Sequence, residues 1–364
     1  MTKICAVHTR VVALSNTTLA TSYGRGLTRR EHLFVAVESA DGVLGVAEGS
    51  PLPHFSGERA PEMKQVIDSV LGPALSGLNV FNLEAIGRAL DSAIAHHPAS
   101  KAALVNAVYD LQGRLLAAPV TRLLGGRLRD RVPLAGAIGI EDETTVLERA
   151  RKLYGVGIRT FKFKVGGDVR RDLAALRAVR DEFGTEVELR ADANGGYSLA
   201  EARRFLAGAE HLSLQYLEQP LPAHDLSGLA RLRAGSLVPI AVDESLFGLN
   251  DAIEIIKQEA ADVFVIKLIK LGGLHNARKV ASIAEASGVT CVCVSPYETD
   301  LGGSANVHLA ASSSAFRYAA ELGTGVTQVR VTGMTGMTAS GGSVEVPTAA
   351  GLGVSLPEGF FAAA

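Results

Sequence analysis

The sequence predicts an α/β protein that consists of a parallel (β/α)8 barrel preceded by a smaller α+β domain. Beyond residue 128, short apolar strands alternate with amphipathic helices, and this alternation is typical of a parallel barrel. No GxGxxG motif follows a strand, which weakens the alternative of a doubly wound open sheet. With 364 residues, 47% of them hydrophobic, the chain is long enough to form both units.

The first unit is expected to span residues 1–127. Apolar and polar residues alternate in ICAVHTRVVAL and EHLFVAVESADGVLGVAEG, which predicts antiparallel strands with a hairpin turn at 40–42. From Pro61 to Leu116 the apolar spacing becomes helical. The glycine-rich, charged segment LLGGRLRDRVPLAG then marks the boundary to the next unit.

The barrel is expected to span residues 128–322. Strand and helix alternate eight times, with the strands at PLAGAIG, TFKFKV, VELRADAN, LQYLEQP, PIAVDES, VFVIKLIK, TCVCVSP and FRYAAEL. Residues 323–364 include GGSVEVP and a tail rich in glycine and alanine, and they are too many for a bare terminus. We expect this third segment to return to the first unit and complete it.

Composition excludes several classes of function. The 36 basic and 38 acidic side chains are mixed without a long basic run, so we expect no nucleic-acid partner. No apolar run is long enough to cross a bilayer, so we expect no membrane partner. The three cysteines give no disulfide framework. Together these observations predict a soluble protein of a reducing compartment, the cytoplasm.

Two lysines on one predicted strand require an explanation. Lys162 and Lys164 are two residues apart in TFKFKV, so they project from the same face of the strand. Adjacent ammonium groups repel each other, and burial makes the repulsion stronger. An isolated pair of this kind usually marks a solvent-facing strand, so other parts of the chain must decide between that interpretation and a functional one.

More ionisable residues follow successive strands at nearly constant spacing. Asp192, Glu218, Asp243 and Lys267 are 24 to 26 residues apart, and Lys164 precedes Asp192 by 28 residues. One β/α unit has about this length, so the five side chains share one level at the carboxyl ends of consecutive strands, where barrels place their active sites. Any one of the acids alone could cap a helix, but five residues in register predict a site.

This layer predicts a metal-dependent proton transfer. Three carboxylates cannot converge unpaired in a buried site, and an all-oxygen ligand set predicts Mg²⁺, with Mn²⁺ as the alternative. Lys164 and Lys267 would flank a small-molecule carboxylate substrate from opposite sides of the barrel mouth. A Lewis acid beside two bases suits removal of a proton from the carbon next to a carboxylate, through an enediolate. The like charge of Lys162 favours the neutral amine that a base at Lys164 requires.

Five motifs, KFK, RADANGG, YLEQPL, AVDES and VIKLIKLGGL, resemble those of the enolase superfamily, specifically its muconate-lactonizing (muconate cycloisomerase-like) subgroup. The likeness extends over essentially the whole chain. It implies a TIM-like barrel of the modified enolase type with an N-terminal α+β capping domain. By motif, it also implies Mg²⁺ ligands at Asp192, Glu218 and Asp243, an acid/base pair at Lys164 and Lys267, and assistance from Lys162 and Asn194.

The resemblance also suggests roles around this centre. Glu244, next to a ligand, would orient a lysine or a metal-bound water, with an ordinary helix-entry acid as the alternative. Loops of the capping domain would select the substrate, with Arg25 and His54 near its far end, although plain loop residues are the alternative. Glu298 would lie at the barrel rim. The resemblance further implies a homo-oligomer.

The catalytic set does not separate the reactions that this subgroup performs. Dipeptide epimerases of the subgroup usually carry an Asp-x-Asp pair beyond the eighth strand, whereas this chain has Glu321 in YAAELGTGV. ELGTG resembles the cycloisomerase pattern, so a muconate-type cycloisomerase is the first expectation. An N-acylamino acid racemase or epimerase is the alternative, followed by an o-succinylbenzoate synthase or a dehydratase.

Two alternatives belong to other classes. A Schiff-base lysine aldolase would use one strand-end lysine, but it does not need three carboxylates in register. A non-catalytic barrel should have lost some of the catalytic positions, and none of them is missing here. Both alternatives are therefore weaker than a metal-dependent isomerase.

Overall fold

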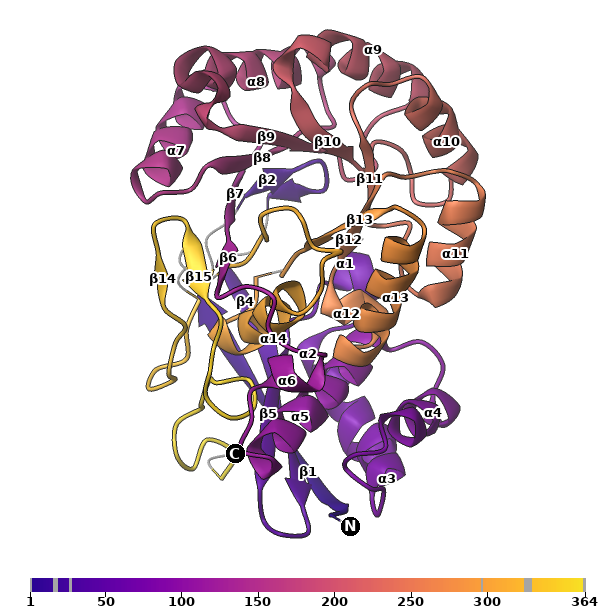
Figure 1. Cartoon of the computed structure of the whole chain (residues 1–364), viewed down its shortest axis with the longest axis vertical. Coiled ribbons are helices and arrows are strands. Elements are labelled where there is room, and N and C mark those ends of the chain that lie inside the picture. Colours follow the sequence, from indigo (N-terminus) through magenta and orange to yellow (C-terminus); the bar gives the residue numbers. More distant parts are fainter. Residues whose placement is uncertain (1, 16–18, 26–27, 296, 324–328, 363–364) are drawn as a thin grey trace.

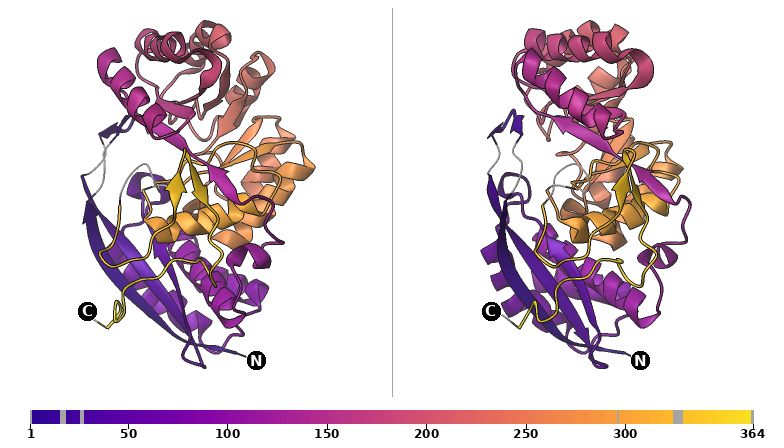
Figure 2. Two further views of the ribbon diagram at one scale, coloured as in Figure 1. Left: turned by 60° about the vertical axis from the view of Figure 1, so that its left-hand side comes forward. Right: turned by 90° about the vertical axis from the view of Figure 1, so that its left-hand side faces the viewer.

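The computed structural model describes residues 2–15, 19–25, 28–295, 297–323 and 329–362. Figure 1 shows a barrel at the top and a smaller α+β part, coloured indigo to purple, at the bottom. In both views of Figure 2 the C-terminal segment (yellow) runs beside the two parts. The predicted fold class is confirmed. Among the described helices, none combines the length and the apolar character that crossing a membrane requires.

A three-stranded antiparallel sheet forms the N-terminal part. Its strands, in the sheet order β1-β4-β5, are Ile4–Ser15, Arg29–Ser39 and Leu44–Gly49. Gly42 makes the predicted hairpin turn between β4 and β5, because its φ is +75° and its N–H donates to the Ser39 carbonyl at 2.9 Å. A separate small hairpin joins β2 (Ala20–Thr21) to β3 (Gly24–Arg25).

Helix α5 (Pro98–Leu115) connects this sheet to the barrel. It is buried on nearly every side, since it packs against β4 and β5 and against the barrel helix α12 (Leu268–Leu271). Gly45 of β5 permits the close approach, because a Cβ atom there would lie 2.3 Å from the carbonyl oxygen of Ala107 in α5. The remaining helices of this part are α1 (Pro53–Ser56), α2 (Ala60–Val66), α3 (Gly72–Leu75), α4 (Leu83–Ala93) and α6 (Val120–Leu123), with a π-helical turn at Ile67–Leu71.

Seven parallel strands form the barrel wall in the order in which they occur along the chain. They are β7 (Ala135–Ile138), β8 (Thr160–Lys164), β9 (Glu188–Asp192), β10 (Leu214–Glu218), β11 (Ile240–Val242), β12 (Val263–Ile266) and β13 (Thr290–Cys293). Residues 316–321 close the barrel through parallel bridges, which join Phe316 to Cys291, Glu321 to Val294 and Ala320 to Leu134. This segment corresponds to the eighth predicted strand.

Each of the seven strands is followed by a helix. The helices are α7 (Glu143–Gly155), α8 (Val169–Phe183), α9 (Leu199–Ala209), α10 (Leu226–Ala234), α11 (Leu249–Lys257), α13 (Leu274–Ala286) and α14 (Asp300–Ala311). Side chains cap the N-termini of several of these helices: Asp168 caps α8, and Ser198 with Glu201 forms a capping box at α9. The prediction of an eighth helix was wrong for the described residues, because the chain turns back toward the N-terminal part after residue 321.

The C-terminal segment contacts both parts. Its two short strands pair with the strand that precedes the barrel, in the order β14 (Ala339–Ser340), β15 (Ser343–Glu345) and β6 (Arg131–Pro133). Further along, the Leu352 N–H donates to Asp110 of α5 at 2.7 Å. The Phe360 ring packs edge-on against Phe34 of β4. These contacts hold the segment against both parts of the molecule.

Candidate active site

Strand register brings the predicted layer together at the carboxyl end of the barrel. Lys164 at the end of β8 pairs with Asp192 on β9, and Asp192 pairs with Glu218 on β10. Glu218 pairs with Ala241 on β11, and Asp243 lies two residues beyond Ala241, so it projects to the same side. The constant spacing in the sequence therefore corresponds to neighbouring side chains in space.

The three carboxylates of this layer are buried and contacted by lysines. Asp192, Glu218 and Asp243 are each exposed by 1% or less. Although burial opposes ionisation, Lys162 and Lys164 hold the pKa of Asp192 well below its usual value. Burial and the neighbouring Asp192 raise the pKa of Glu218 well above its usual value, so the group is crowded with negative charge.

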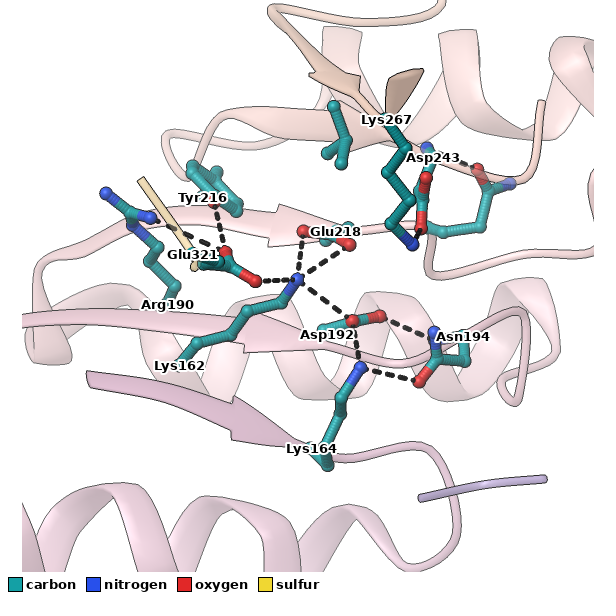
Figure 3. Close-up of polar contacts among 12 residues, drawn as sticks. Lys162, Lys164, Arg190, Asp192, Asn194, Tyr216, Glu218, Asp243, Lys267 and Glu321 are labelled. Carbon is teal, nitrogen blue, oxygen red and sulfur yellow. Dashed lines mark hydrogen bonds and ion pairs between the residues drawn. The ribbon is translucent and has the colours of Figure 1, made fainter. Parts of the chain in front are cut away.

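Lys162 lies at the centre of the network in Figure 3. Its Nζ lies 2.8 Å from Glu218 Oε1, 2.8 Å from Glu321 Oε2 and 3.1 Å from Asp192 Oδ2. Burial alone would lower the pKa of Lys162, but the three carboxylates raise it well above its ordinary value. The charge of Lys162 is therefore compensated on three sides, whereas the sequence argument treated it as an unpaired neighbour of Lys164.

Lys164 belongs to a hydrogen-bond chain that reaches the capping part. Its Nζ donates to Asp192 Oδ2 at 2.6 Å and to Asn194 Oδ1 at 3.1 Å. Asn194 Nδ2 donates to Glu244 Oε1 at 3.1 Å, and the Tyr23 hydroxyl donates to the same oxygen at 2.7 Å. Asn194 adopts a φ of +45°, a conformation that Asn tolerates better than most residues. Glu244 thus orients Asn194, which in turn holds Lys164.

Lys267 occupies the corresponding place beyond β12. Its Nζ donates to Asp243 and lies 4.3 Å from the centroid of the Phe55 ring, which belongs to α1 of the capping part. Lys270, which is fully buried, donates to Asp243 Oδ1 at 2.6 Å and to the Val265 carbonyl at 3.0 Å. The sequence analysis did not assign Lys270 a role, although the spacing KLIK places it one helical turn after Lys267.

A cavity of about 490 Å³ opens in front of these lysines. Its described wall comes from the barrel and from the capping part, and it includes Tyr23, Arg30, Leu52, His54, Phe55, Lys162, Lys164, Asn194, Lys267, Ser295, Tyr297 and Glu321. A volume of this size is typical of a site for a small organic ligand.

The remaining predicted residues occupy three different environments. His54 of α1 lines the cavity with its ring 5.1 Å from that of Tyr23, and burial, followed by Arg30, Lys267 and Lys164, lowers its pKa. Arg25 lies in β3, and its side chain is outside the described part of the structure. Glu298 is buried and lies outside the described cavity wall, in contrast to the expected rim position.

The chain after β13 turns inward under the capping sheet, which explains the position of Glu298. Its Oε2 accepts a hydrogen bond from Asn306 Nδ2 of α14 at 3.0 Å. Glu48 of β5 lies nearby and accepts hydrogen bonds from the backbone N–H groups of Thr299 and Gly302. Burial, followed by the charge of Glu48, raises the pKa of Glu298 to about 8. Glu298 is therefore part of the contact between the two parts of the molecule.

The raised pKa of Glu298 predicts a stability that depends on pH. Between about pH 4.5 and 8 the folded chain keeps a proton that the unfolded chain releases, so the free energy of unfolding falls as pH rises, by up to about 5 kcal/mol. We expect Glu298→Gln to remove this loss and to be more stable than the parent chain at pH 8.5. Urea unfolding at pH 5.5 and 8.5 measures the effect, with the exposed Glu254→Gln as control. An unchanged pH dependence in Glu298→Gln would contradict the prediction.

The layer of carboxylates also fits a divalent cation by its chemistry. As they stand, no three acidic, histidine or cysteine side chains of the described residues converge closely enough to hold an ion. The donor set is nevertheless all oxygen, buried and mutually repulsive, and Glu244 Oε2 is a further buried oxygen without a hydrogen-bond partner. Ammonium groups of Lys162, Lys164, Lys267 and Lys270 now supply the positive charge that a cation would provide.

Comparison with known protein families identifies both parts of the chain. Residues 7–125 match the mandelate racemase / muconate lactonizing enzyme N-terminal domain, and residues 145–359 match the enolase C-terminal domain-like family. The chain belongs to the enolase superfamily. Within this superfamily it belongs to the muconate-lactonizing subgroup. It is an isomerase, because its relatives in this group are racemases, epimerases and cycloisomerases.

Three relatives illustrate the likeness. An N-succinyl-L-Arg/Lys racemase of Bacillus cereus is 34% identical over 85% of this chain and 84% of its own, and the crystal structure of that racemase has a TM-score of 0.93. A hydrophobic dipeptide epimerase of Enterococcus faecalis is 33% identical over 97% of this chain and 99% of its own. The crystal structure of that epimerase with Mg and the dipeptide L-Leu-L-Tyr has a TM-score of 0.91. A chloromuconate cycloisomerase of Cupriavidus necator is 30% identical over 90% of both chains.

These relatives change the order of the expected reactions. The sequence analysis put a cycloisomerase first on the basis of the ELGTG motif. The comparisons favour the alternative of a racemase or epimerase, because the relatives with that activity are the more similar ones. The ELGTG motif and the comparisons therefore favour different reactions.

Proposed function

We propose that this protein is a Mg²⁺-dependent racemase of N-acylated amino acids. The observation that carries the proposal is that two lysines from distant strands line one cavity. Lys164 belongs to β8, and Lys267 directly follows β12. Inversion of a carbon centre needs one group that removes the proton and a second that returns it to the other face. The similarity to an N-succinyl amino acid racemase and a dipeptide epimerase supports this reaction over cycloisomerisation.

Mg²⁺ would be held by Asp192, Glu218 and Asp243. When bound, the ion supplies Lewis-acid stabilisation of the negative charge that develops on the substrate carboxylate. Lys270 and Lys162 hold these carboxylates in place through their ion pairs. Their contribution is to keep the donor groups in one orientation.

The two lysines at the cavity would move the proton. Lys164 Nζ takes or returns it on one face, and its hydrogen bond to Asn194 fixes the direction of the amine. Lys267 Nζ does the same on the other face, where the Phe55 ring covers it and excludes water. Both roles require an amine that can lose its proton, and the positive charge of a cation bound at the carboxylates would favour the neutral amine.

Deuterium exchange tests the proposed function directly. The full chain with Mg²⁺ is incubated in D₂O with N-acetyl and N-succinyl amino acids, dipeptides and cis,cis-muconate, and NMR follows the hydrogen on the carbon next to the carboxylate. We expect exchange and loss of optical rotation with an N-acyl amino acid. Turnover of muconate without exchange of any N-acyl amino acid would overturn the racemase proposal in favour of a cycloisomerase.

We also propose that the chain functions as a cytoplasmic homo-oligomer, on the basis of its family. The expected result of sedimentation equilibrium is a mass that is a multiple of the 38.0 kDa chain. A single species at the chain mass, over the whole range of working concentrations, would contradict the proposed assembly without affecting the proposed chemistry.

A further inference from the structure

One cation in the described cavity wall has no carboxylate partner. Arg30 lies in β4, next to Arg29 at the start of the strand, and it lines the cavity. Its guanidinium stacks over the Tyr297 ring, with 4.0 Å from Cζ to the ring centroid. Its Nε is buried without a hydrogen-bond partner in the described structure. Burial lowers the pKa of Arg30, and the only charge interaction that counters this effect among the described residues is with Tyr297, not with a carboxylate.

The other charges of the cavity wall are already balanced. Lys162, Lys164 and Lys267 each contact a carboxylate of the buried layer. Glu321 is the single carboxylate among the described wall residues, and its Oε2 accepts a hydrogen bond from Lys162 at 2.8 Å. A positively charged substrate group would therefore find no free acid in the described wall, whereas a negatively charged one would find Arg30.

We infer that Arg30 binds a second carboxylate at the far end of the substrate. This inference rests on the proposed function, in which the first carboxylate lies at the buried layer. The substrate is then an N-acyl amino acid whose acyl chain ends in a carboxylate. A carboxylate matches the planar guanidinium fork in a way that a neutral acyl chain does not, and it can accept the hydrogen bond that the buried Nε lacks. Stacking on Tyr297 holds the plane of the fork before the substrate arrives.

Binding of two matched ligands tests this inference apart from catalysis. N-succinylglycine and N-butanoylglycine have chains of the same length and differ in whether the chain ends in a carboxylate or a methyl group. Isothermal titration calorimetry with the full chain and Mg²⁺ gives the dissociation constant of each. We expect the parent chain to bind N-succinylglycine about 10- to 100-fold more tightly, as a charge-assisted pair warrants. We expect Arg30→Met to lose this preference.

Arg29 provides the matched control. It is the neighbour of Arg30 in β4 and is exposed, and its side chain leaves the strand on the opposite face. Arg29→Met removes the same net charge and should keep the preference for N-succinylglycine. Arg30→Lys keeps the charge without the fork and should keep only part of the preference. If Arg30→Met does not fold, as judged by thermal unfolding, this lysine variant carries the test.

The outcomes separate this inference from the proposed function. Equal affinity of the parent chain for the two ligands, or a preference that persists in Arg30→Met and Arg30→Lys, would overturn the role of Arg30. The proposed racemase activity would still stand if N-acetyl amino acids exchange their α-hydrogen in D₂O. Conversely, a preference that depends on Arg30 without any exchange of N-succinyl amino acids would support the carboxylate site and contradict the racemase reaction.

Discussion

Replacement of Glu218 by glutamine is expected to lower kcat by about 10³-fold or more and to leave the fold intact. The substitution keeps the size and one oxygen of the side chain but removes its negative charge. Loss of that charge should lower the affinity for Mg²⁺. The electrostatic stabilisation that the ion supplies should fall as well, and such stabilisation commonly raises kcat by about 10²- to 10³-fold or more. The effect on folding should be small, because burial and Asp192 already oppose the ionisation of Glu218.

Two measurements separate these effects. Calorimetric titration with Mg²⁺ reports whether the ion binds, and circular dichroism with thermal unfolding reports whether the chain is folded. Glu188→Gln is the matched control, because Glu188 is an exposed glutamate at the opposite end of the neighbouring strand β9. A Glu218→Gln variant that binds Mg²⁺ with parent affinity and retains activity would show that Glu218 is not a ligand.

The central layer was predictable because it depends on local regularities. Side chains alternate along a strand, and β/α units repeat at a nearly constant length, so position in the sequence determines which residues share the level of Asp192 and Glu218. The kind of residue in that layer then indicates the chemistry. Both arguments need only short stretches of sequence and the assumption of a parallel barrel.

The surroundings of the layer were not predictable, because they depend on contacts between distant segments. Lys162 is neutralised in part by Glu321, which is 159 residues away and belongs to the segment that closes the barrel. The burial of Glu298 follows from the way the capping sheet covers the loop after β13, and sequence spacing does not report on such packing. Arg30 is a comparable case, since its significance depends on Tyr297 and on the lack of a carboxylate partner for Arg30 in the described cavity wall.

Replacement of either Lys164 or Lys267 by alanine is expected to block net racemisation while one half of the reaction survives. Each lysine serves one face of the substrate, so the loss of a positioned acid or base should lower racemisation by about 10²- to 10⁴-fold. The enantiomer that presents its α-hydrogen to the remaining lysine should still exchange it for deuterium. The two variants should therefore retain exchange with opposite enantiomers.

The environments of the two lysines predict a further difference between the variants. Lys164 contacts Asp192, which keeps an ion pair with Lys162, and Asn194, which would lose this hydrogen bond and with it the link from Lys164 to Glu244. Lys267 lies against Phe55 and contacts Asp243, which keeps a second ion pair with Lys270. Lys267→Ala should therefore disturb the hydrogen bonds around the metal ligands less than Lys164→Ala does, and its surviving half-reaction should be closer to the parent rate.

NMR in D₂O with separate L and D enantiomers of one N-acyl amino acid measures this pattern. Lys152→Ala, at an exposed position of α7, is the control and should racemise at the parent rate. Loss of exchange with both enantiomers in both variants, in folded protein that still binds Mg²⁺, would mean that the lysines act as one unit on one face. A cycloisomerase would differ from both of these outcomes, because its reaction needs a proton moved on one face of the substrate only. One of the two variants would then keep substantial turnover. The stereochemistry of the surviving exchange therefore decides between a reaction with two bases and a reaction with one.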